Sequence, residues 1–524
     1  MSNEVRFGTA GLRARMGDGP GEFNATLVAR ATSGLATYLK VRQIPGPVLV
    51  GFDARHGSAG FAAEAASVFA GAGFGVMLMP RPLPTPVLAF AVRGAAAGVM
   101  ITASHNPATD NGYKVYLADG AQVAPPEDAA IEAAMAAAPP ASEIRRATDG
   151  LSRSDDTVEA MLLASRQARS GRIAVAPETV VESYLNRAVG VLQPDGPRAL
   201  RVAYTPLHGV AGETFRRAWA ASGFERLVEV REQATPDPDF PTVAFPNPEE
   251  PGALDLAVAA AVRSNAELVL AHDPDGDRCA VMVPAAGGFR ALSGDEVGAL
   301  LAEHLLSTGR IPTDGVLATT IVSSPLLERI AAAHGRRCVR TLTGFKWLAR
   351  VPDLAYAYEE ALGYCTDPAG VRDKDGITAA LLVAELAAGC RAEGTDLQGR
   401  LDDLDRRYGA HASAARSLRT TDTADVAAVL ARLLTDPPSA LAGHRVSAVT
   451  DLSAAGTGLP PTTGVRLDAG SVSAIVRPSG TEPKLKVYLH GALASPAVDL
   501  ARDRAALAAA LAAAGTELVA RLGS

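Results

Sequence analysis

The chain has 524 residues, 48% of them hydrophobic and 20% charged, and its formal net charge is −7. This length exceeds what one hydrophobic core usually serves, so we expect roughly three to five domains of ordinary size. The acidic balance provides no overall basic field to attract nucleic acid or an anionic membrane surface, so an anionic substrate needs local binding groups.

Cysteine usage and the N-terminus predict a cytoplasmic protein. The cysteines form neither CxxC pairs nor a dense framework, which is typical of reduced thiols. The opening sequence MSNEVRFGTAG lacks the order of a signal peptide, and no uninterrupted apolar run reaches the ~18 residues that span a membrane. We therefore expect no membrane partner, and no structural disulfide among Cys279, Cys338, Cys365 and Cys390.

Three segments share one pattern, in which a short apolar run leads through a loop rich in Gly, Pro, His or Ser into a helix-compatible stretch that ends at glycine. They are PVLVGFDARHGSAGFAAEAASVFAGAG from Pro47, LRVAYTPLHGVAGETFRRAWAASG from Leu200 and GVLATTIVSSPLLERIAAAHG from Gly315. Three successive α/β units of similar architecture are therefore expected. Between the first two, the Ala/Pro-rich residues 133–146 predict a flexible surface insertion.

After about Ala410 the pattern changes to that of a smaller α+β domain. A helix is predicted near residues 421–435, followed by strands in VSAVTDL, GVRLDAG, SVSAIVR and LKVYLHG. A last helix is predicted with Ser495 as its N-cap, Pro496 at its first position and Gly515 near its end.

The first candidate site lies in GVMITASHNPATDNGYKVYL, residues 98–117. GVMIT predicts a buried strand, and the pairs NP and NG break the pattern before YKVYL begins. Ser104 then lies exposed on a tight turn beside His105, with Lys114 close by, where its hydroxyl can act as a nucleophile or phosphate carrier. The alternative is a turn whose Ser and Asn side chains satisfy backbone groups. The loop lacks the GxSxG of a hydrolase nucleophile elbow.

The second candidate site is LVLAHDPDGDRCAVMV, where Asp273, Asp275 and Asp277 alternate after an apolar strand. Alternate side chains of an extended chain share a face, so the three carboxylates can converge on one point. Hard oxygen ligands favour Mg²⁺. An EF-hand is excluded because Arg278 and Pro284 stand where its glycine and glutamate are needed. The alternative is a solvated acidic turn.

Two further sets combine glycine turns with charged or hydroxyl side chains. In SAIVRPSGTEPKLKVYL, arginine, hydroxyls and turn amides can grip an anion, and the alternative is an ordinary Pro-Ser-Gly turn. Acceptors for sugar hydroxyls and cations for phosphoryl charge occur in RFGTAGLRARMG, TLTGFKWLAR and YAYEEALGYCTDPAGVRDKDG. The alternative is that these segments are charged surface loops. The residues of interest in the two sets are Arg477, Ser479, Gly480, Thr481, Lys486, Arg13, Arg15, Lys346, Glu359, Glu360, Arg372, Asp373, Lys374 and Asp375.

TASHNP, DPDGDR, EEALGY and RPSGTEPK, in this order, closely resemble the α-D-phosphohexomutase superfamily over nearly the whole chain. FGTAGLRARMG, TGFKW and DKDG further resemble its phosphoglucomutase and phosphopentomutase branch, which includes glucose 1,6-bisphosphate synthases. The resemblance implies a heart-shaped α/β protein, with three related mixed α/β domains and a smaller α+β C-terminal domain around a central cleft. The expected domains are 1–192 with the phosphoserine loop, 193–298 with the metal loop, 299–412 with the sugar-recognition loop and 413–524 with the phosphate-binding loop.

The resemblance also assigns roles to residues that match the family's motifs. Ser104 would be the phosphoserine and a metal ligand, and Asp273, Asp275 and Asp277 would hold Mg²⁺. Lys346 and Arg13 are candidates for the general acid and base, although arginine rarely deprotonates and an electrostatic role for Arg13 is safer. The full catalytic set would be Ser104, His105, Lys114, Arg13, Lys346 and Arg278. The substrate-binding set would be Glu359, Glu360, Arg477, Ser479, Gly480, Thr481 and Lys486.

The implied activity moves a phosphoryl group between the 1- and 6-positions of a sugar, or the 1- and 5-positions of a pentose. It proceeds through phosphoserine and a bisphosphorylated sugar, with a sugar bisphosphate such as glucose 1,6-bisphosphate as primer. Ala361 stands where phosphoglucomutases and phosphomannomutases of the superfamily commonly carry serine. EEALGY is more similar to the pentose branch, so ribose and deoxyribose phosphates are candidates beside glucose and mannose phosphates. The expected protein is a monomer or homodimer acting on small sugar phosphates.

Other functions stay open at this point. One is a glucose 1,6-bisphosphate synthase. Another is a haloacid-dehalogenase-like phosphatase with Asp273 as nucleophile and Asp275 as acid/base, although Asp277 replaces the Thr or Val usual in that class. A third is a sugar-phosphate sensor without turnover, which the full set of catalytic groups disfavours.

Overall fold

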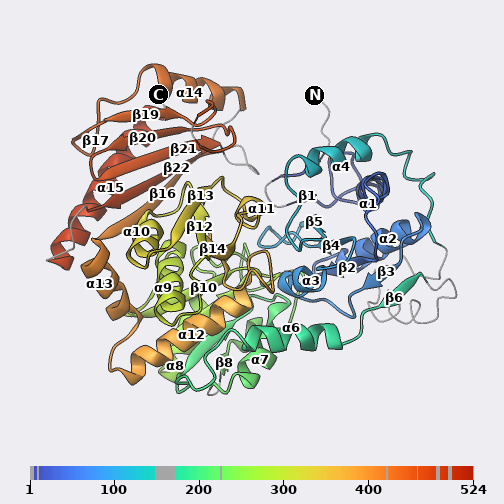
Figure 1. The fold of residues 1–524 in the computed structure, drawn as a ribbon, viewed down its shortest axis with the longest axis horizontal. Helices are drawn as coiled ribbons and strands as arrows, with labels where there is room; N and C mark the ends of the chain where they lie inside the picture. The colour runs from blue at the N-terminus through green and yellow to red at the C-terminus, as the bar shows by residue number, and fades with distance from the viewer. Residues whose placement is uncertain are drawn as a thin grey trace. The chain divides into compact units, whose positions relative to one another are not determined.

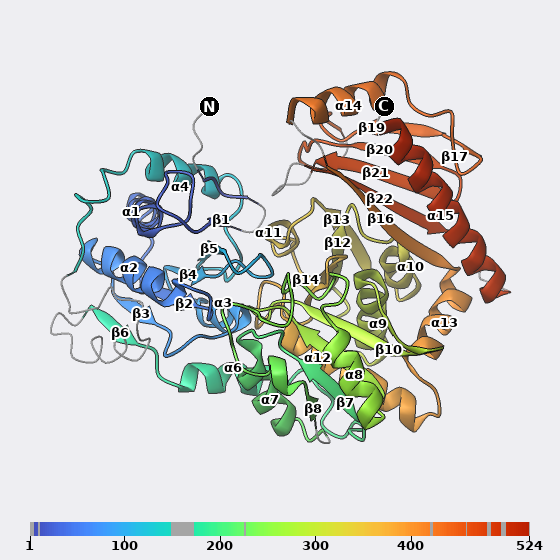
Figure 2. The same ribbon diagram turned by 180° about the vertical axis from the view of Figure 1, so that it is seen from behind.

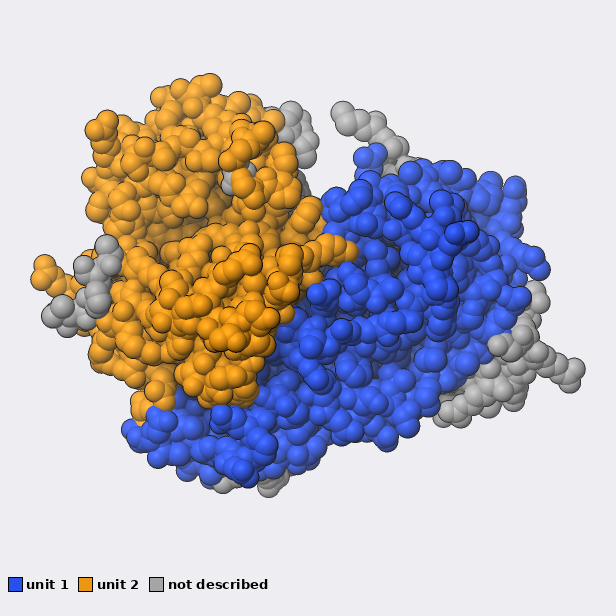
Figure 3. Space-filling view, viewed as in Figure 1, with its two compact units in different colours: residues 1–292, 362–394 blue, residues 293–361, 395–524 orange. Residues whose placement is uncertain are grey.

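The computed structural model describes residues 5–8, 11–147, 172–224, 227–419, 423–456, 458–478, 484–493 and 499–522 (Figures 1 and 2). The chain divides into two compact units, coloured separately in Figure 3. Unit 1 comprises residues 1–292 and 362–394, and unit 2 comprises residues 293–361 and 395–524. Unit 1 contains a six-stranded and a five-stranded sheet, and unit 2 contains three strands of a further α/β sheet, a five-stranded antiparallel sheet and the two-stranded β17-β18 sheet.

The first sheet of unit 1 has the strand order β1-β5-β4-β2-β3-β6. Strands β2, β3, β4 and β6 are parallel, whereas β5 runs antiparallel to β4 and to β1. Buried aliphatic and aromatic side chains of the strands and of α1, α2 and α4 form its core. The elements are β1 (Leu12–Arg15), α1 (Ala25–Val41), β2 (Val48–Phe52), α2 (Ser58–Gly71), β3 (Val76–Leu78), α3 (Thr85–Ala91), β4 (Ala97–Ile101), β5 (Asp110–Leu117), α4 (Glu127–Ala136) and β6 (Ile173–Val175).

The second sheet of unit 1 has the order β11-β10-β9-β7-β8, in which β7, β8 and β9 are parallel and β10 is antiparallel to β9. Helix α12 packs against β9 and β10. The other elements of unit 1 are α6 (Thr179–Val189), β7 (Val202–Thr205), α7 (Ala211–Ala221), β8 (Leu227–Glu229), η1 (Arg231–Gln233), α8 (Asp255–Ser264), β9 (Leu268–His272), β10 (Cys279–Ala285), β11 (Gly288–Ala291), β15 (Gly363–Cys365) and α12 (Gly376–Ala392). Of these, β15 is not a strand of this sheet.

In the first sheet of unit 2, β12 lies between β13 and β14, and all three strands are parallel. Helices α9 and α10 pack on these strands. The elements are α9 (Gly294–Ser307), β12 (Val316–Thr320), α10 (Leu326–Ala333), β13 (Arg337–Thr341), α11 (Phe345–Leu348), β14 (Leu354–Glu359) and α13 (Leu397–Tyr408).

The three α/β sheets share one topology, which confirms the prediction from the three repeated segments. In each sheet the first strand of the segment (β2, β7 or β12) lies between the next two parallel strands of the chain. A left-handed glycine follows the helix of each segment at Gly73, Gly223 and Gly335, as expected for a helix C-terminus. Parallel strands present their carboxyl ends at the same edge of a sheet. The loops that follow the neighbouring strands β2 and β4, β7 and β9, and β12 and β14 therefore lie together in pairs.

The C-terminal residues form the predicted α+β domain (Figure 1). Its antiparallel sheet has the order β16-β22-β21-β20-β19, and the buried faces of α14 and α15 pack on it. The elements are β16 (His411–Arg419), α14 (Thr423–Thr435), β17 (Ala440–Leu441), β18 (His444–Arg445), β19 (Ala448–Asp451), β20 (Val465–Ala469), β21 (Val472–Pro478), β22 (Lys484–Ala492) and α15 (Leu500–Leu522).

One local prediction is wrong. Gly515 lies inside α15 and does not end it, because the helix continues to bury Leu518 and Leu522 against the sheet. Residues 133–146 lie mostly at the surface, as predicted, and the buried side chains of Met135 and Ile144 anchor them. The predicted cap at Ser495 and Pro496 lies outside the described residues.

Helix α15 is also the one helix in the described part of the chain that is long and apolar enough to cross a membrane. Its buried leucines contribute to the core of the C-terminal domain. The core helix of an ordinary globular domain meets the same criterion, so this finding alone is weak evidence for a membrane span.

Candidate active site

Ser104 lies in the loop that joins β4 to β5 and has left-handed backbone, with φ of +54°. Its hydroxyl donates to Asp273 Oδ2 at 2.7 Å and lies 3.1 Å from His105 Nδ1. The residue is 1% exposed, so the prediction of an exposed hydroxyl is wrong. Contacts with the neighbouring Thr102 and His105, with Arg55, and with Asp273, 169 residues later in the chain, enclose it.

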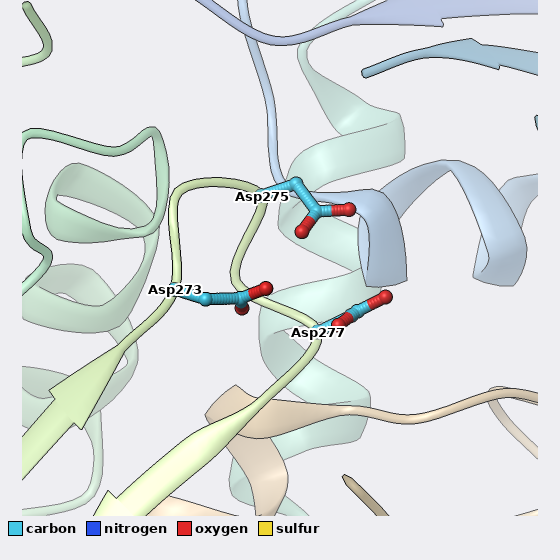
Figure 4. Close-up of side chains that lie close together, drawn as sticks. All are labelled: Asp273, Asp275 and Asp277. Atoms are coloured by element: carbon cyan, nitrogen blue, oxygen red, sulfur yellow. The ribbon is translucent and has the colours of Figure 1, made fainter. Parts of the chain in front are cut away.

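The three alternating aspartates lie in the loop between β9 and β10, and their carboxylates turn toward one another (Figure 4). One oxygen of each lies within 4.8 Å of the others, and all three side chains are buried. The predicted convergence of Asp273, Asp275 and Asp277 is therefore what the structure shows.

Neighbours hold at least one oxygen of each carboxylate of this triad, and both oxygens of Asp273, whose Oδ2 accepts from Ser104. Asp273 Oδ1 accepts from the backbone N–H of Arg278 at 3.0 Å. Lys114 Nζ donates to Asp275 Oδ2 at 2.6 Å and to Asp277 Oδ2 at 2.9 Å. Thr85 Oγ1 also donates to Asp275 Oδ2, at 2.6 Å.

The other oxygens of the triad suit a cation. Asp275 Oδ1 and Asp277 Oδ1 are buried and accept no hydrogen bond from the described residues. Buried acceptors without partners are rare in folded proteins, and hard carboxylate oxygens at this spacing match the ligand preference of Mg²⁺. The donor set therefore fits a divalent metal ion.

Charges around the triad differ from one carboxylate to the next. Burial and the charges of Asp275 and Asp277 raise the pKa of Asp273 well above its usual value. Burial acts in the same direction on Asp277, but Lys114 and Lys374 outweigh it and lower the pKa of Asp277. A bound cation would favour the ionised form of all three carboxylates.

The predicted basic residues of unit 1 gather around the same point. Arg13 Nη1 donates to Asn106 Oδ1 at 3.1 Å, and burial lowers the pKa of Arg13. Burial and the positive charge of Arg278 lower the pKa of His105 well below 6.5, so its imidazole is neutral at pH 7. Although burial opposes it, the negative charges of the triad raise the pKa of Lys114, which therefore stays protonated.

Sequence reasoning named Lys374 without assigning it to the metal loop, and it missed Thr85. Lys374 Nζ lies 3.0 Å from Asp277 Oδ2, and its place in the quoted DKDG motif was the available signal. Thr85 stands at the start of α3, 190 residues from its partner Asp275, and no motif marked it. Arg15, by contrast, is exposed.

The remaining candidates lie in unit 2, which is described by itself. Glu359 ends β14 and is buried, and Glu360 Oε2 accepts from Thr320 Oγ1 at 3.1 Å and Ser323 Oγ at 3.0 Å. Lys346 lies in α11 and is buried.

The phosphate-binding candidates of unit 2 lie on two paired strands. Arg477 on β21 donates to Thr343 Oγ1 of the TGFKW loop and pairs across the sheet with Lys486 on β22. Ser479, Gly480 and Thr481 lie outside the described residues.

Three α/β domains of common topology and an α+β domain, with an acidic triad against a serine hydroxyl, define a metal-dependent phosphosugar enzyme. The chain belongs to the phosphoglucomutase/phosphomannomutase family. It matches alpha/beta/alpha domain I over residues 4–141, domain II over 182–287, domain III over 293–408 and the C-terminal domain over 419–508. The domain boundaries predicted above stay predictions.

Individual relatives cover nearly the whole chain. A probable phosphomannomutase of Haemophilus influenzae is 39% identical over 89% of this chain and 92% of its own length. Human phosphopentomutase is 34% identical over 92% of this chain and 84% of its own length. A solved putative phosphomannomutase from Thermus thermophilus aligns with a TM-score of 0.71 and 25% identity, covering 99% of this chain and 100% of that one.

The protein is therefore an enzyme, a phosphosugar mutase that combines phosphotransferase chemistry with an isomerase outcome. The haloacid-dehalogenase-like alternative loses its support, because all four mutase domains match in order.

Proposed function

We propose that Ser104 carries the phosphoryl group of this mutase and that Asp273, Asp275 and Asp277 bind Mg²⁺ beside it. The observation that supports this most directly is the 2.7 Å contact between Ser104 Oγ and Asp273 Oδ2. Asp275 Oδ1 and Asp277 Oδ1, which accept no hydrogen bond from the described residues, add the donor set for the cation. Bound Mg²⁺ would offset charge on the transferring group.

In the proposed cycle a sugar hydroxyl oxygen bonds to phosphorus and the bond from phosphorus to Ser104 Oγ breaks, giving a bisphosphorylated sugar. Transfer of the sugar's other phosphoryl group to Ser104 restores phosphoserine, and the product differs from the substrate in which oxygen stays phosphorylated. Charged Lys114 holds two aspartates and is not a base. Neutral His105 contacts Ser104 Oγ and can exchange a proton there. Lys346 and Arg13 stay candidates at the sugar oxygens.

The proposed substrates are small sugar 1-phosphates that include pentose 1-phosphates. Relatives of this chain are named phosphomannomutase, phosphoribomutase and phosphopentomutase. From the match of EEALGY to the family motif we assign the sugar contact to Glu359, and we assign a supporting role to Glu360, whose Oε2 accepts from Thr320 and Ser323. A cytoplasmic location, a sugar bisphosphate primer and the absence of nucleic-acid or membrane partners stay predictions.

A substrate panel tests the sugar assignment. We expect kcat/KM for ribose and deoxyribose 1-phosphates to match or exceed the values for glucose and mannose 1-phosphates. Ala361→Ser restores a hydroxyl beside the sugar-binding glutamates, so it should shift the ratio toward hexoses by about tenfold, the scale of one hydrogen bond. Ala332→Ser on an exposed face of α10 is the control. An unchanged ratio in Ala361→Ser would remove position 361 from the specificity argument.

Replacement of the serine tests the catalytic assignment. Ser104→Ala should abolish isomerisation, because no oxygen remains to carry the phosphoryl group. Ser183→Ala, at an exposed serine of α6, should turn over like the wild type. Isomerisation by Ser104→Ala at the wild-type rate would reject the assignment.

A further inference from the structure

Arg55 belongs to the first of the three repeated segments, in the loop between β2 and α2, and has no part in the chemistry proposed above. Its guanidinium donates hydrogen bonds to backbone carbonyls of the Ser104 loop. Nη2 donates to the carbonyls of Ser104 and Asn106, both at 2.6 Å, and Nη1 donates to Pro107 O at 2.7 Å and Asp110 O at 3.4 Å. Arg55 is 4% exposed, so these bonds are shielded from water.

The Ser104 loop needs such support. A non-glycine residue with left-handed backbone costs on the order of 1–3 kcal/mol and persists only where its surroundings fix it. Ser104 is such a residue, with φ of +54°. Four carbonyl contacts from one planar group fix the loop from its strained residue to the start of β5.

The guanidinium is itself held from two sides. Arg55 Nε lies 3.4 Å from Asp53 Oδ2, and Asp53 Oδ1 accepts from Ser58 Oγ and from the Arg55 backbone N–H. The ring of Phe240 covers the guanidinium, with 5.0 Å between the carbon Cζ and the ring centroid. Lysine cannot reproduce this arrangement, because it offers three donors on a point charge in place of five donors in a plane.

The same relation recurs in the other two repeated segments. In the second, the backbone N–H of Val210 donates to Pro274 O within the metal loop at 2.8 Å, and a Cβ on Gly209 would lie 2.4 Å from Pro274 Cα. In the third, Thr320 and Ser323 hold Glu360. In each α/β sheet, residues at the end of the first strand of the repeated segment (β2, β7 or β12) or in the loop after it thus support the candidate functional loop that follows β4, β9 or β14.

We propose that Arg55 is a positioning residue for phosphoryl transfer, which fixes the backbone of residues 104–110 so that the Ser104 hydroxyl is directed at Asp273. The proposal rests on the function proposed for Ser104. It assigns to the first repeated segment a role in rate and none in sugar binding. Among the described residues, the side-chain hydrogen bonds of Arg55 go to the loop backbone, and its charge interacts with Asp273 and Asp275 without a hydrogen bond to either.

The test compares Arg55→Lys with a matched control, Arg146→Lys. Arg146 lies in the same sheet domain and also donates to backbone carbonyls, Ala141 O and Ile144 O, and to a carboxylate, Glu64 Oε1. For both variants we would measure the single-turnover rate of phosphoryl transfer from glucose 1,6-bisphosphate to the enzyme, kcat and KM for glucose 1-phosphate, and Mg²⁺ affinity by calorimetry.

Arg55→Lys should lower the transfer rate and kcat by about 10- to 100-fold, the effect of a small misplacement of a reacting group, while KM and Mg²⁺ affinity stay within about twofold. Arg146→Lys should retain the wild-type rate. A wild-type transfer rate in Arg55→Lys, or an equal loss in both variants, would overturn the proposal. Absence of phosphate on wild-type Ser104 would instead reject the proposed function itself.

A second variant keeps the test decisive if Arg55→Lys does not fold. Phe240→Leu leaves the contacts of Arg55 with the loop in place and removes only the aromatic ring over the guanidinium. We expect a fall in kcat of about threefold at unchanged KM, because the guanidinium loses one of its two supports. Wild-type kcat in folded Phe240→Leu, with Arg55→Lys unfolded, would count against positioning.

Discussion

Lys114 is the residue on which two of the three acidic side chains depend. Its Nζ lies within 2.9 Å of Asp275 Oδ2 and Asp277 Oδ2, and all three side chains are at most 1% exposed. Removing one partner of a buried ion pair is strongly destabilising, because the remaining charge stays buried without compensation. Lys374 Nζ lies 3.0 Å from Asp277 Oδ2 and adds a second positive charge at that carboxylate.

We therefore expect Lys114→Met to lower the free energy of unfolding of unit 1 by about 3 kcal/mol. Of the chain's two tryptophans, Trp219 lies in unit 1 and Trp347 in unit 2. In a Trp347→Phe background, urea unfolding followed by Trp219 fluorescence reports on unit 1. Lys40→Met, at an exposed lysine of α1, is the control. Equal, small changes in both variants would show that Lys114 does not stabilise the triad.

At the scale of elements, the start of α12 is sensitive to pH. Asp375 is its N-cap and accepts from the N–H groups of Ile377 and Thr378 and from the hydroxyl of Tyr184 on α6. Burial raises the pKa of Asp375 to about 6. Because the folded state binds this proton more tightly than the unfolded state, ionisation removes stability as the pH rises from about 4 to about 6.

Asp375→Asn should remove this pH dependence while keeping an acceptor at the cap. The wild type should lose about 2 to 3 kcal/mol of unfolding free energy relative to the variant between pH 4 and pH 7. Urea unfolding at the two pH values measures it. Asp396→Asn, at the exposed N-cap of α13, is the control. The same pH trend in both variants would contradict a specific role for Asp375.

At the scale of the whole molecule, ligand binding and folding are linked through the metal site. A ligand that binds only the folded state stabilises it by about 2.7 kcal/mol at one hundred times its dissociation constant. The wild-type Tm should therefore rise on addition of Mg²⁺ and fall back with a chelator. Asp277→Asn removes one charged ligand and should show a smaller rise at the same concentration. Asp314→Asn, at an exposed site, should respond like the wild type. An equal Mg²⁺ response in Asp277→Asn would place the metal elsewhere.

The sequence predicts the parts of this molecule that depend on neighbouring residues. The periodicity of hydrophobic residues and the turn residues indicate β2, β7 and β12 with their helices. The alternation of side chains along an extended chain places the three aspartates on one face. Contacts between distant positions are not encoded in that way. Two such contacts are the burial of Ser104 by Asp273 and the hydrogen bonds from Arg55 to residues 104–110. They arise only when separate segments fold together.

The central claim is that Ser104 is the phosphate carrier, and peptide mapping of the phosphoenzyme tests it most directly. The protein would be incubated with glucose 1,6-bisphosphate and Mg²⁺, quenched in acid and analysed by mass spectrometry. The account predicts one phosphoryl group on the peptide that contains Ser104, stable to hydroxylamine and absent from Ser104→Ala. A phosphoryl group on the peptide of Asp273 that hydroxylamine releases would contradict it.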